Sequence, residues 1–163
     1  MATVDVSNGI NAGTHPSRAI RKEPYKVEVD VNLATATTTK GSALAASDVL
    51  EVIDVPAKTM VWAAGFEVVT PSDGDFNVDV GITGTDVDAF VDGFDCDSNS
   101  TGDMTNLPAA YQPQVVASDD TIDVLLTSGG SAYPTSGVWR AWAVMQDVSN
   151  DLGPDEVDRD QLA

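Results

Sequence analysis

The chain has 163 residues, of which 42% are apolar, and its 26 acids against 8 bases give a formal net charge of −18. That length and apolar content suffice for one ordinary domain with its own core. The excess of acids excludes nucleic acid as a partner of the folded body, because phosphates need clustered Lys and Arg. Nucleic-acid binding remains a remote option only for the N-terminal segment.

The charges are divided by position. The first forty residues contain five of the eight bases and four acids, whereas the rest contains three bases and 22 acids. The five bases are Arg18, Arg21, Lys22, Lys26 and Lys40. The leader is therefore about +1 and the remainder −19, which predicts an adhesive arm ahead of an anionic body. This arrangement fits an assembly component better than an enzyme, and the negative body suits a saline environment.

Composition divides the chain into three parts. Residues 1–26 are rich in Asn, Gly, Ser, Thr and Pro and have no structural period, so they are predicted to form an extended N-terminal arm. Residues 27–148 should form the folded body, and residues 149–163 an acidic C-terminal tail. There is no signal peptide and no run of eighteen apolar residues, so we expect a protein made in a cytoplasm without membrane contact.

The first half of the body predicts three strands. Residues 27–33 alternate between apolar and polar, as in a half-buried strand, while the small, Thr-rich residues 34–47 predict a loop or an edge strand. A second strand at residues 48–55 ends before a proline. Residues 60–70 are apolar on both sides, which is typical of a central strand in a sandwich.

The second half predicts three more strands. The alternation is clearest at residues 75–82, and the long polar segment that follows is expected to contain a short helix at residues 86–91. Strands at residues 121–127 and 137–148 are joined by a flexible link at residues 128–131. Six strands without a long helix predict an all-β fold, an antiparallel β-sandwich that could be a jelly roll.

One loop has a pattern of oxygen ligands. They recur at every second position, as in a calcium-binding loop, at Asp95, Asp97, Asn99, Thr101 and Asp103. The match ends there, because Ser100 stands where the tight turn needs glycine and Asn106 stands where a bidentate Glu would close the site. We therefore expect a hydrated polar loop, with no metal and no cofactor.

Catalytic groups are not evident. The single histidine, His15, lies in the predicted arm, where nothing would hold it as a general base. The single cysteine, Cys96, lies between two acids whose charge should raise the thiol pKa and leave an inert loop thiol. Acid pairs could hydrolyse glycosides, but among 26 acids any pair can be chosen. The sequence therefore predicts a protein that is not an enzyme.

Three tryptophans could form a platform for sugar rings. Trp139 and Trp142 have opposite parity on one predicted strand, so they cannot share a face without a bulge, and at least one should be in the core. Trp62 is also expected in the core. Gly65, in the same strand as Trp62, predicts a bulge or the close approach of another backbone.

The arm is the better candidate for recognition. Extended segments can add to the sheet edge of a partner or lie in a groove. The predicted partner-binding residues are His15, Arg18, Arg21, Lys22, Tyr25 and Lys26. Their positive charges would suit an acidic neighbour, which includes an identical subunit. The alternative is a terminus with no binding role.

The body resembles a known family. The stretches DVLEVIDVPAKTMVWAAGFEVVT, DFNVDVGITGTDVDAFVDG, ASDDTIDVLLTSGG and VWRAWAVMQDV, within roughly residues 48–148, are similar to head cement or decoration proteins of marine and cyanobacterial tailed phages. The resemblance implies a small β-sandwich on the capsid exterior and brings no catalytic residues. It implies the major capsid protein as partner and a homotrimer at local threefold positions.

Two functions from different classes are therefore carried forward. The first is a capsid cement or decoration protein that binds the shell and stabilises the head. The second is a β-sandwich that binds carbohydrate or calcium and serves in host attachment.

Overall fold

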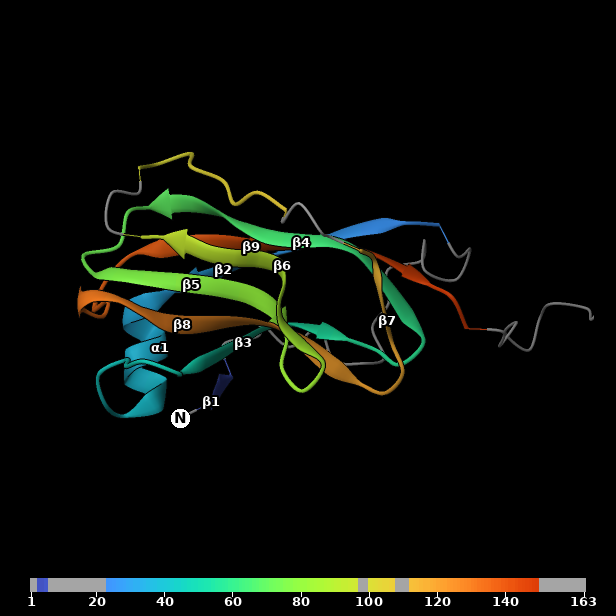
Figure 1. The fold of residues 1–163 in the computed structure, drawn as a ribbon, viewed down its shortest axis with the longest axis horizontal. Coiled ribbons are helices and arrows are strands. Elements are labelled where there is room, and N and C mark those ends of the chain that lie inside the picture. Colours follow the sequence, from blue (N-terminus) through green and yellow to red (C-terminus); the bar gives the residue numbers. More distant parts are fainter. Residues whose placement is uncertain (1–2, 6–22, 97–99, 108–111, 150–163) are drawn as a thin grey trace, which may run out of the picture.

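The computed structural model describes residues 3–5, 23–96, 100–107 and 112–149. Within these residues the chain forms nine strands and one short helix, with the strands in two sheets packed face to face (Figure 1). In chain order they are β1 Thr3–Asp5, β2 Tyr25–Asn32, α1 Leu33–Lys40, β3 Val49–Val55, β4 Thr59–Thr70, β5 Asp75–Ile82, β6 Asp86–Asp95, β7 Gln114–Val116, β8 Asp120–Ala132 and β9 Val138–Asp147. The predicted all-β sandwich is confirmed.

The strand order is that of a jelly roll. Sheet A has the order β1-β3-β8-β5-β6 and sheet B the order β2-β9-β4-β7. All neighbours are antiparallel except β1, which runs parallel to β3. From β2 to β9 the chain changes sheet at every step except between β5 and β6, and the eight strands form the two four-stranded sheets of the jelly-roll pattern.

The core lies between the two sheets, where every second side chain of a strand points inward. In β2 this rule holds throughout, since its odd-numbered residues are buried and its even-numbered residues are exposed. Aromatic rings fill the centre: Trp139 of β9 stacks on Phe66 of β4 with ring centroids 4.9 Å apart, and lies 5.8 Å from Phe76 of β5. Burial of each such Phe contributes about 1.5–3 kcal/mol.

The Thr-rich segment after β2 was expected to be a loop or an edge strand, and its first part is instead the helix α1. The side chain of Asn32 accepts two backbone N–H hydrogen bonds of the first turn, at 3.0 and 3.2 Å. Gly41 ends the helix with a left-handed φ of 75°, which glycine adopts without strain. Leu33 and Ala36 are buried and fix the helix to the body. No helix in the described part of the chain is long and apolar enough to cross a membrane.

Three other elements differ from expectation. Residues 86–91, expected to be helical, lie in β6, whose pairing with β5 has register shifts that hide the alternation. Residues 128–131, expected to be a flexible link, are part of β8. Thr3–Asp5, within the segment expected to be an arm, forms β1 on the edge of β3. The folded part therefore includes a strand from the very start of the chain.

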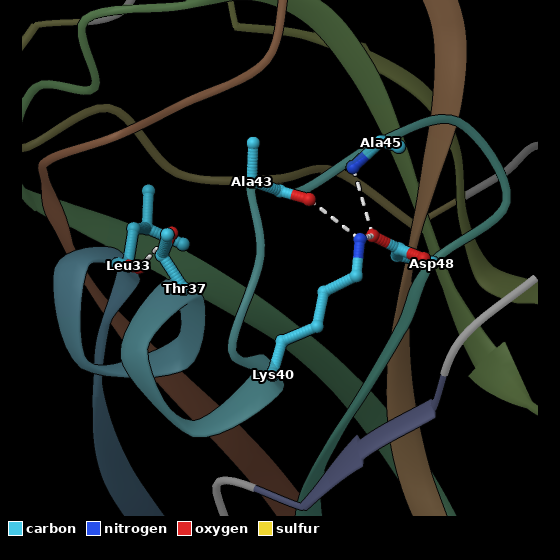
Figure 2. Close-up of polar contacts among 6 residues, drawn as sticks. All are labelled: Leu33, Thr37, Lys40, Ala43, Ala45 and Asp48. Atoms are coloured by element: carbon cyan, nitrogen blue, oxygen red, sulfur yellow. Dashed lines mark hydrogen bonds and ion pairs between the residues drawn. The ribbon is translucent and has the colours of Figure 1, made fainter.

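A buried ion pair joins α1 to the start of β3. Figure 2 shows the ammonium group of Lys40 donating to Oδ2 of Asp48, with side chains only 11% and 3% exposed. The same ammonium donates to the carbonyl of Ala43 at 2.6 Å, and Oδ2 of Asp48 also accepts from the N–H of Ala45 at 2.8 Å. The charge of Lys40 is therefore neutralised inside the body and is not presented to a partner.

Candidate functional site

Exposed large apolar side chains gather along β4. Among the described residues six such side chains are exposed, and four of them lie on β4 or on the two segments that pair with its outer edge. These four are Trp62, Met104, Leu107 and Val115, exposed by 41%, 54%, 41% and 55%. We call them the β4 patch. Exposed apolar side chains that follow one strand are a candidate protein-binding surface.

A β-bulge turns Trp62 outward. The register between β4 and β9 shifts between Val61 and Ala63, so Trp62 has no partner residue on β9. Its indole Nε1 donates to Oε1 of Gln146 at 2.9 Å, and its ring remains exposed. The expectation that Trp62 is in the core is therefore wrong, because the bulge reverses the alternation of the strand at this point.

The short strand β7 adds an exposed apolar residue to the same end of β4. Met60 of β4 pairs with Val115 of β7 on one side and with Gln146 of β9 on the other. Residues paired across antiparallel strands point to the same face of a sheet. Val115 therefore lies in one row with Met60 and Gln146 on the outer face of sheet B, and Gln146 is the residue that binds the Trp62 indole.

The segment 102–105 adds the second half of the patch by pairing with the other end of β4. The N–H of Gly102 donates to the carbonyl of Val68, and the N–H of Val68 donates to the carbonyl of Asp103, both at 2.8 Å. The N–H of Thr105 donates to the carbonyl of Phe66 at 3.1 Å. These bonds hold Met104 at the edge of β4, three residues before Leu107.

Gly65 permits this close packing. A Cβ atom at Gly65 would lie 2.3 Å from Oγ1 of Thr105 and 3.2 Å from a ring carbon of Trp142. The close approach at Gly65 is therefore made by side chains and not by the backbone that was expected. Trp142 lies on the outer face of sheet B, whereas Trp139 is buried on the inner face, so the two tryptophans point to opposite sides as their parity requires.

Ion pairs border the outer face of sheet B on the β2 side. Lys26 pairs with Glu28 at 2.6 Å, and Nε of Arg140 donates to Asp30 at 2.9 Å. The hydrogen bond and the charge of Asp30 raise the pKa of Arg140. Such exposed pairs contribute little to stability, because water and salt screen them. They leave the face with charges of both signs.

Sheet A differs sharply in charge. Its strands β3, β5 and β8 carry two acids each and β6 carries four, and none of these strands contains a Lys or Arg. The strands of sheet B carry four acids and two bases. A surface of one sign repels other anionic surfaces and favours water. The two faces of the sandwich therefore differ in what they can contact.

Two carboxyl groups show how crowded the acids of sheet A are. Burial raises the pKa of Asp79, and the charges of Asp92 and Asp88 raise it further, against a hydrogen bond from the N–H of Gly93 that lowers it. Burial also raises the pKa of Asp123, although hydrogen bonds from neighbouring threonines act in the opposite direction. The ionised form of both carboxyl groups is therefore disfavoured in the folded protein, and a further negative charge nearby would disfavour it more.

The predicted partner-binding residues divide into two groups. Tyr25 begins β2, is only 6% exposed and points into the core, so its ring offers no surface to a partner. Lys26 is exposed on the outer face of sheet B in its ion pair with Glu28. The others, His15, Arg18, Arg21 and Lys22, lie outside the described residues.

The loop with calcium-like spacing is only partly described. Asp97 and Asn99 lie outside the described residues, and Asp95 is exposed at the end of β6. Asp103 accepts the N–H of Ser100 at 2.6 Å, a turn that organises the loop internally. Among the described residues no three His, Cys, Asp or Glu side chains come together as metal ligands.

Cys96 is buried just after β6 and belongs to the core. Its thiol pKa is raised to about 12, first by burial and then by the charge of Asp95. The direction expected from the sequence is confirmed, but burial and not the neighbouring acids is the larger cause.

Comparison with known proteins concerns the fold. No family model and no curated protein matches the chain. A chain of the capsid of Ralstonia phage GP4 is similar, with a TM-score of 0.59 and 16% identity over 90% of this chain and 99% of that chain. The chain shares its fold with a phage capsid chain. A chain of the acidic stable capsid structure of Helicobacter pylori bacteriophage KHP30 aligns with a TM-score of 0.47 and 12% identity, over 75% of this chain and 85% of that chain.

Proposed function

We propose that this chain is a non-enzymatic virion structural protein, a capsid cement or decoration protein that binds the major capsid protein and stabilises the head. The observation that carries the proposal is the contrast between the apolar β4 patch on sheet B and the strands of sheet A, which carry acids only. A protein attached to the outside of a shell needs one face for the shell and another for water. The fold shared with the phage GP4 capsid chain supports the same reading.

In this proposal sheet B faces the shell. Trp62 and Met104 are large, exposed and adaptable side chains, of kinds that are enriched at protein interfaces. The acids of sheet A would then point to solvent, where salt screens their mutual repulsion and their charge keeps decorated particles apart. The orientation follows from physical complementarity between the two faces and their surroundings.

The basic part of the N-terminal segment would add a second contact. His15, Arg18, Arg21 and Lys22, together with Lys26 on β2, would bind an acidic surface of the shell protein or of a neighbouring copy. Decoration at local threefold positions would make the protein a homotrimer on the particle. Both contacts are parts of the proposal that can be tested separately.

The test compares two matched variants in cosedimentation with undecorated heads. Val115→Asp places a charge in the β4 patch, and Val87→Asp places the same charge on β6 of sheet A, where the wild-type side chain is 38% exposed. An unpaired charge buried in an apolar interface is strongly unfavourable, so Val115→Asp should weaken binding about tenfold or more. Val87→Asp should bind as the wild type does.

Equal binding of both variants and the wild type would show that sheet B does not face the shell. A triple variant of the arm, in which Arg18, Arg21 and Lys22 become alanine, tests the second contact by itself. If the arm takes part, this variant should lose affinity and the remaining binding should be less sensitive to salt. Unchanged binding and unchanged salt dependence would remove the arm from the proposal.

One observation favours carbohydrate binding as a second candidate. Trp62 is exposed, and Gln146 beside it could hydrogen-bond a hydroxyl group of a sugar ring stacked on the indole. Quenching or a shift of tryptophan fluorescence on titration with surface polysaccharides of a host would support this function. The Trp62→Ala variant, which keeps the other two tryptophans, is the control.

A further inference from the structure

We infer that the outer edge of β3 is a strand-acceptor site, and that its occupant in assemblies is the β1 strand of a second copy of this chain. In the described structure β1 lies on this edge in parallel register, with Thr3 beside Val49 and Asp5 beside Glu51. β1 is therefore the donor strand and the edge of β3 is the acceptor. The β1 strand on this edge can come from the same chain or from a neighbouring copy.

The acceptor edge is built by the body alone. Asp48, immediately before β3, holds Lys40 at the end of α1, and this buried pair fixes the helix beside the first residues of the edge (Figure 2). β1 lies against both β3 and α1 at this corner of the sandwich (Figure 1). The bonds of this pair with Ala43 and Ala45 come from the body, so we expect the corner to keep its shape when the strand leaves.

The pairing of β1 with its own body is weak. It involves three residues only, whereas β3 has seven. The entropy lost when a residue is ordered is comparable to or larger than the free energy that one hydrogen bond returns, so three paired residues come close to balance.

The chain is long enough for the strand to reach a neighbour. Nineteen residues, 6–24, separate β1 from β2, and when extended they span roughly 60 Å. A body of this size has a radius of gyration of only about 14 Å. Contacts within the chain and between chains are identical, so the local concentration of neighbours decides between them. The exchange does not depend on the proposed function, although a decorated shell would supply such neighbours.

Disulfide trapping tests the exchange. A chain carrying Asp5→Cys is mixed with a tagged chain carrying Glu51→Cys, so a disulfide between these positions can form only between copies. Neighbouring strands bring paired residues within disulfide range. The native thiol can stay, because Cys96 is buried. The control replaces the Glu51→Cys chain with one carrying Asp30→Cys, an exposed acid of β2 far from β1 in the sheet order.

At about 1 mM protein, near the effective concentration that a short linker provides, the matched pair should give about tenfold more covalent dimer than the control. The inference is overturned if the matched pair forms no more dimer than the control. It is also overturned if a chain carrying both cysteines closes its disulfide only within itself at every concentration.

Discussion

The buried ion pair between Lys40 and Asp48 offers the sharpest test of how the body is held together. Asp48→Ala removes the carboxylate and leaves an ammonium group whose side chain is only 11% exposed and which still donates to the carbonyl of Ala43. Removing one partner of a buried pair costs about 3–5 kcal/mol, because the remaining charge stays out of water. For a chain of this length, that loss lowers the melting temperature by about 6–20 °C.

The measurement is urea unfolding at pH 7, in which the midpoint should fall while the dependence on urea stays unchanged. Glu28→Ala is the matched control, since it breaks the exposed pair with Lys26 and should cost at most about 1 kcal/mol. The double variant Lys40→Met with Asp48→Leu should recover most of the stability, because no charge is then buried. If Asp48→Ala is no more costly than Glu28→Ala, the pair does not hold α1 to β3.

Three further predictions concern the site and its surroundings. Gly65→Ala should displace Thr105 and the segment that carries Met104, because the new Cβ would lie 2.3 Å from the threonine hydroxyl; faster proteolysis at residues 100–107 than in the wild type is expected, and identical cleavage would contradict it. Asp123→Asn should raise the melting temperature at pH 7, because burial raises the pKa of this carboxyl and its charged form costs stability as pH rises through that pKa; the gain should shrink on acidification, and a less stable variant at pH 7 would refute it. Cys96 should not react with a thiol reagent at pH 8 until the protein unfolds, since its pKa is about 12 and it is buried; rapid reaction of the native protein would show that the core opens there.

Strands with regular alternation could be predicted from the sequence, and those with irregular pairing could not. β2 and β5 alternate without interruption through most of their length, so period-two hydrophobicity finds them directly. β6 is shifted in register twice against β5, and buried Phe90 is followed by buried Val91, a pattern that resembles a short helix. Local patterns cannot show which partner strand will impose such shifts.

The same limit explains why the β4 patch was not found. Trp62 shares its parity with buried Phe66 and Val68, and only the bulge after Val61 places it on the other face. A bulge depends on the neighbouring strand, which the sequence of β4 does not contain. The exposure of Met104 and Leu107 could have been predicted, because large apolar residues in a polar loop lie outside the strands that form the predicted core. Helix α1 had readable caps, Asn32 and Gly41, but its threonines favour other conformations.

The charge pattern was more informative for function than for structure. The prediction of an anionic body is sharpened by the fold, because the jelly roll separates the acids by sheet and leaves Trp62 and Val115 on the less charged side. The positive charge that the N-terminal forty residues can offer to a partner is smaller than their composition indicates, because Lys40 is neutralised by Asp48 and Lys26 pairs with Glu28. The difference in charge between the two faces therefore follows from the strand order, which cannot be obtained from residue counts alone.

An electron cryo-microscopy reconstruction of heads decorated with this protein would test the central claim most directly. The proposal predicts density for the sandwich on the outside of the shell, with β4 and β7 against the capsid surface and β5 and β6 facing solvent. A reconstruction with sheet A against the shell, or heads that carry no bound protein at saturating concentration, would contradict it.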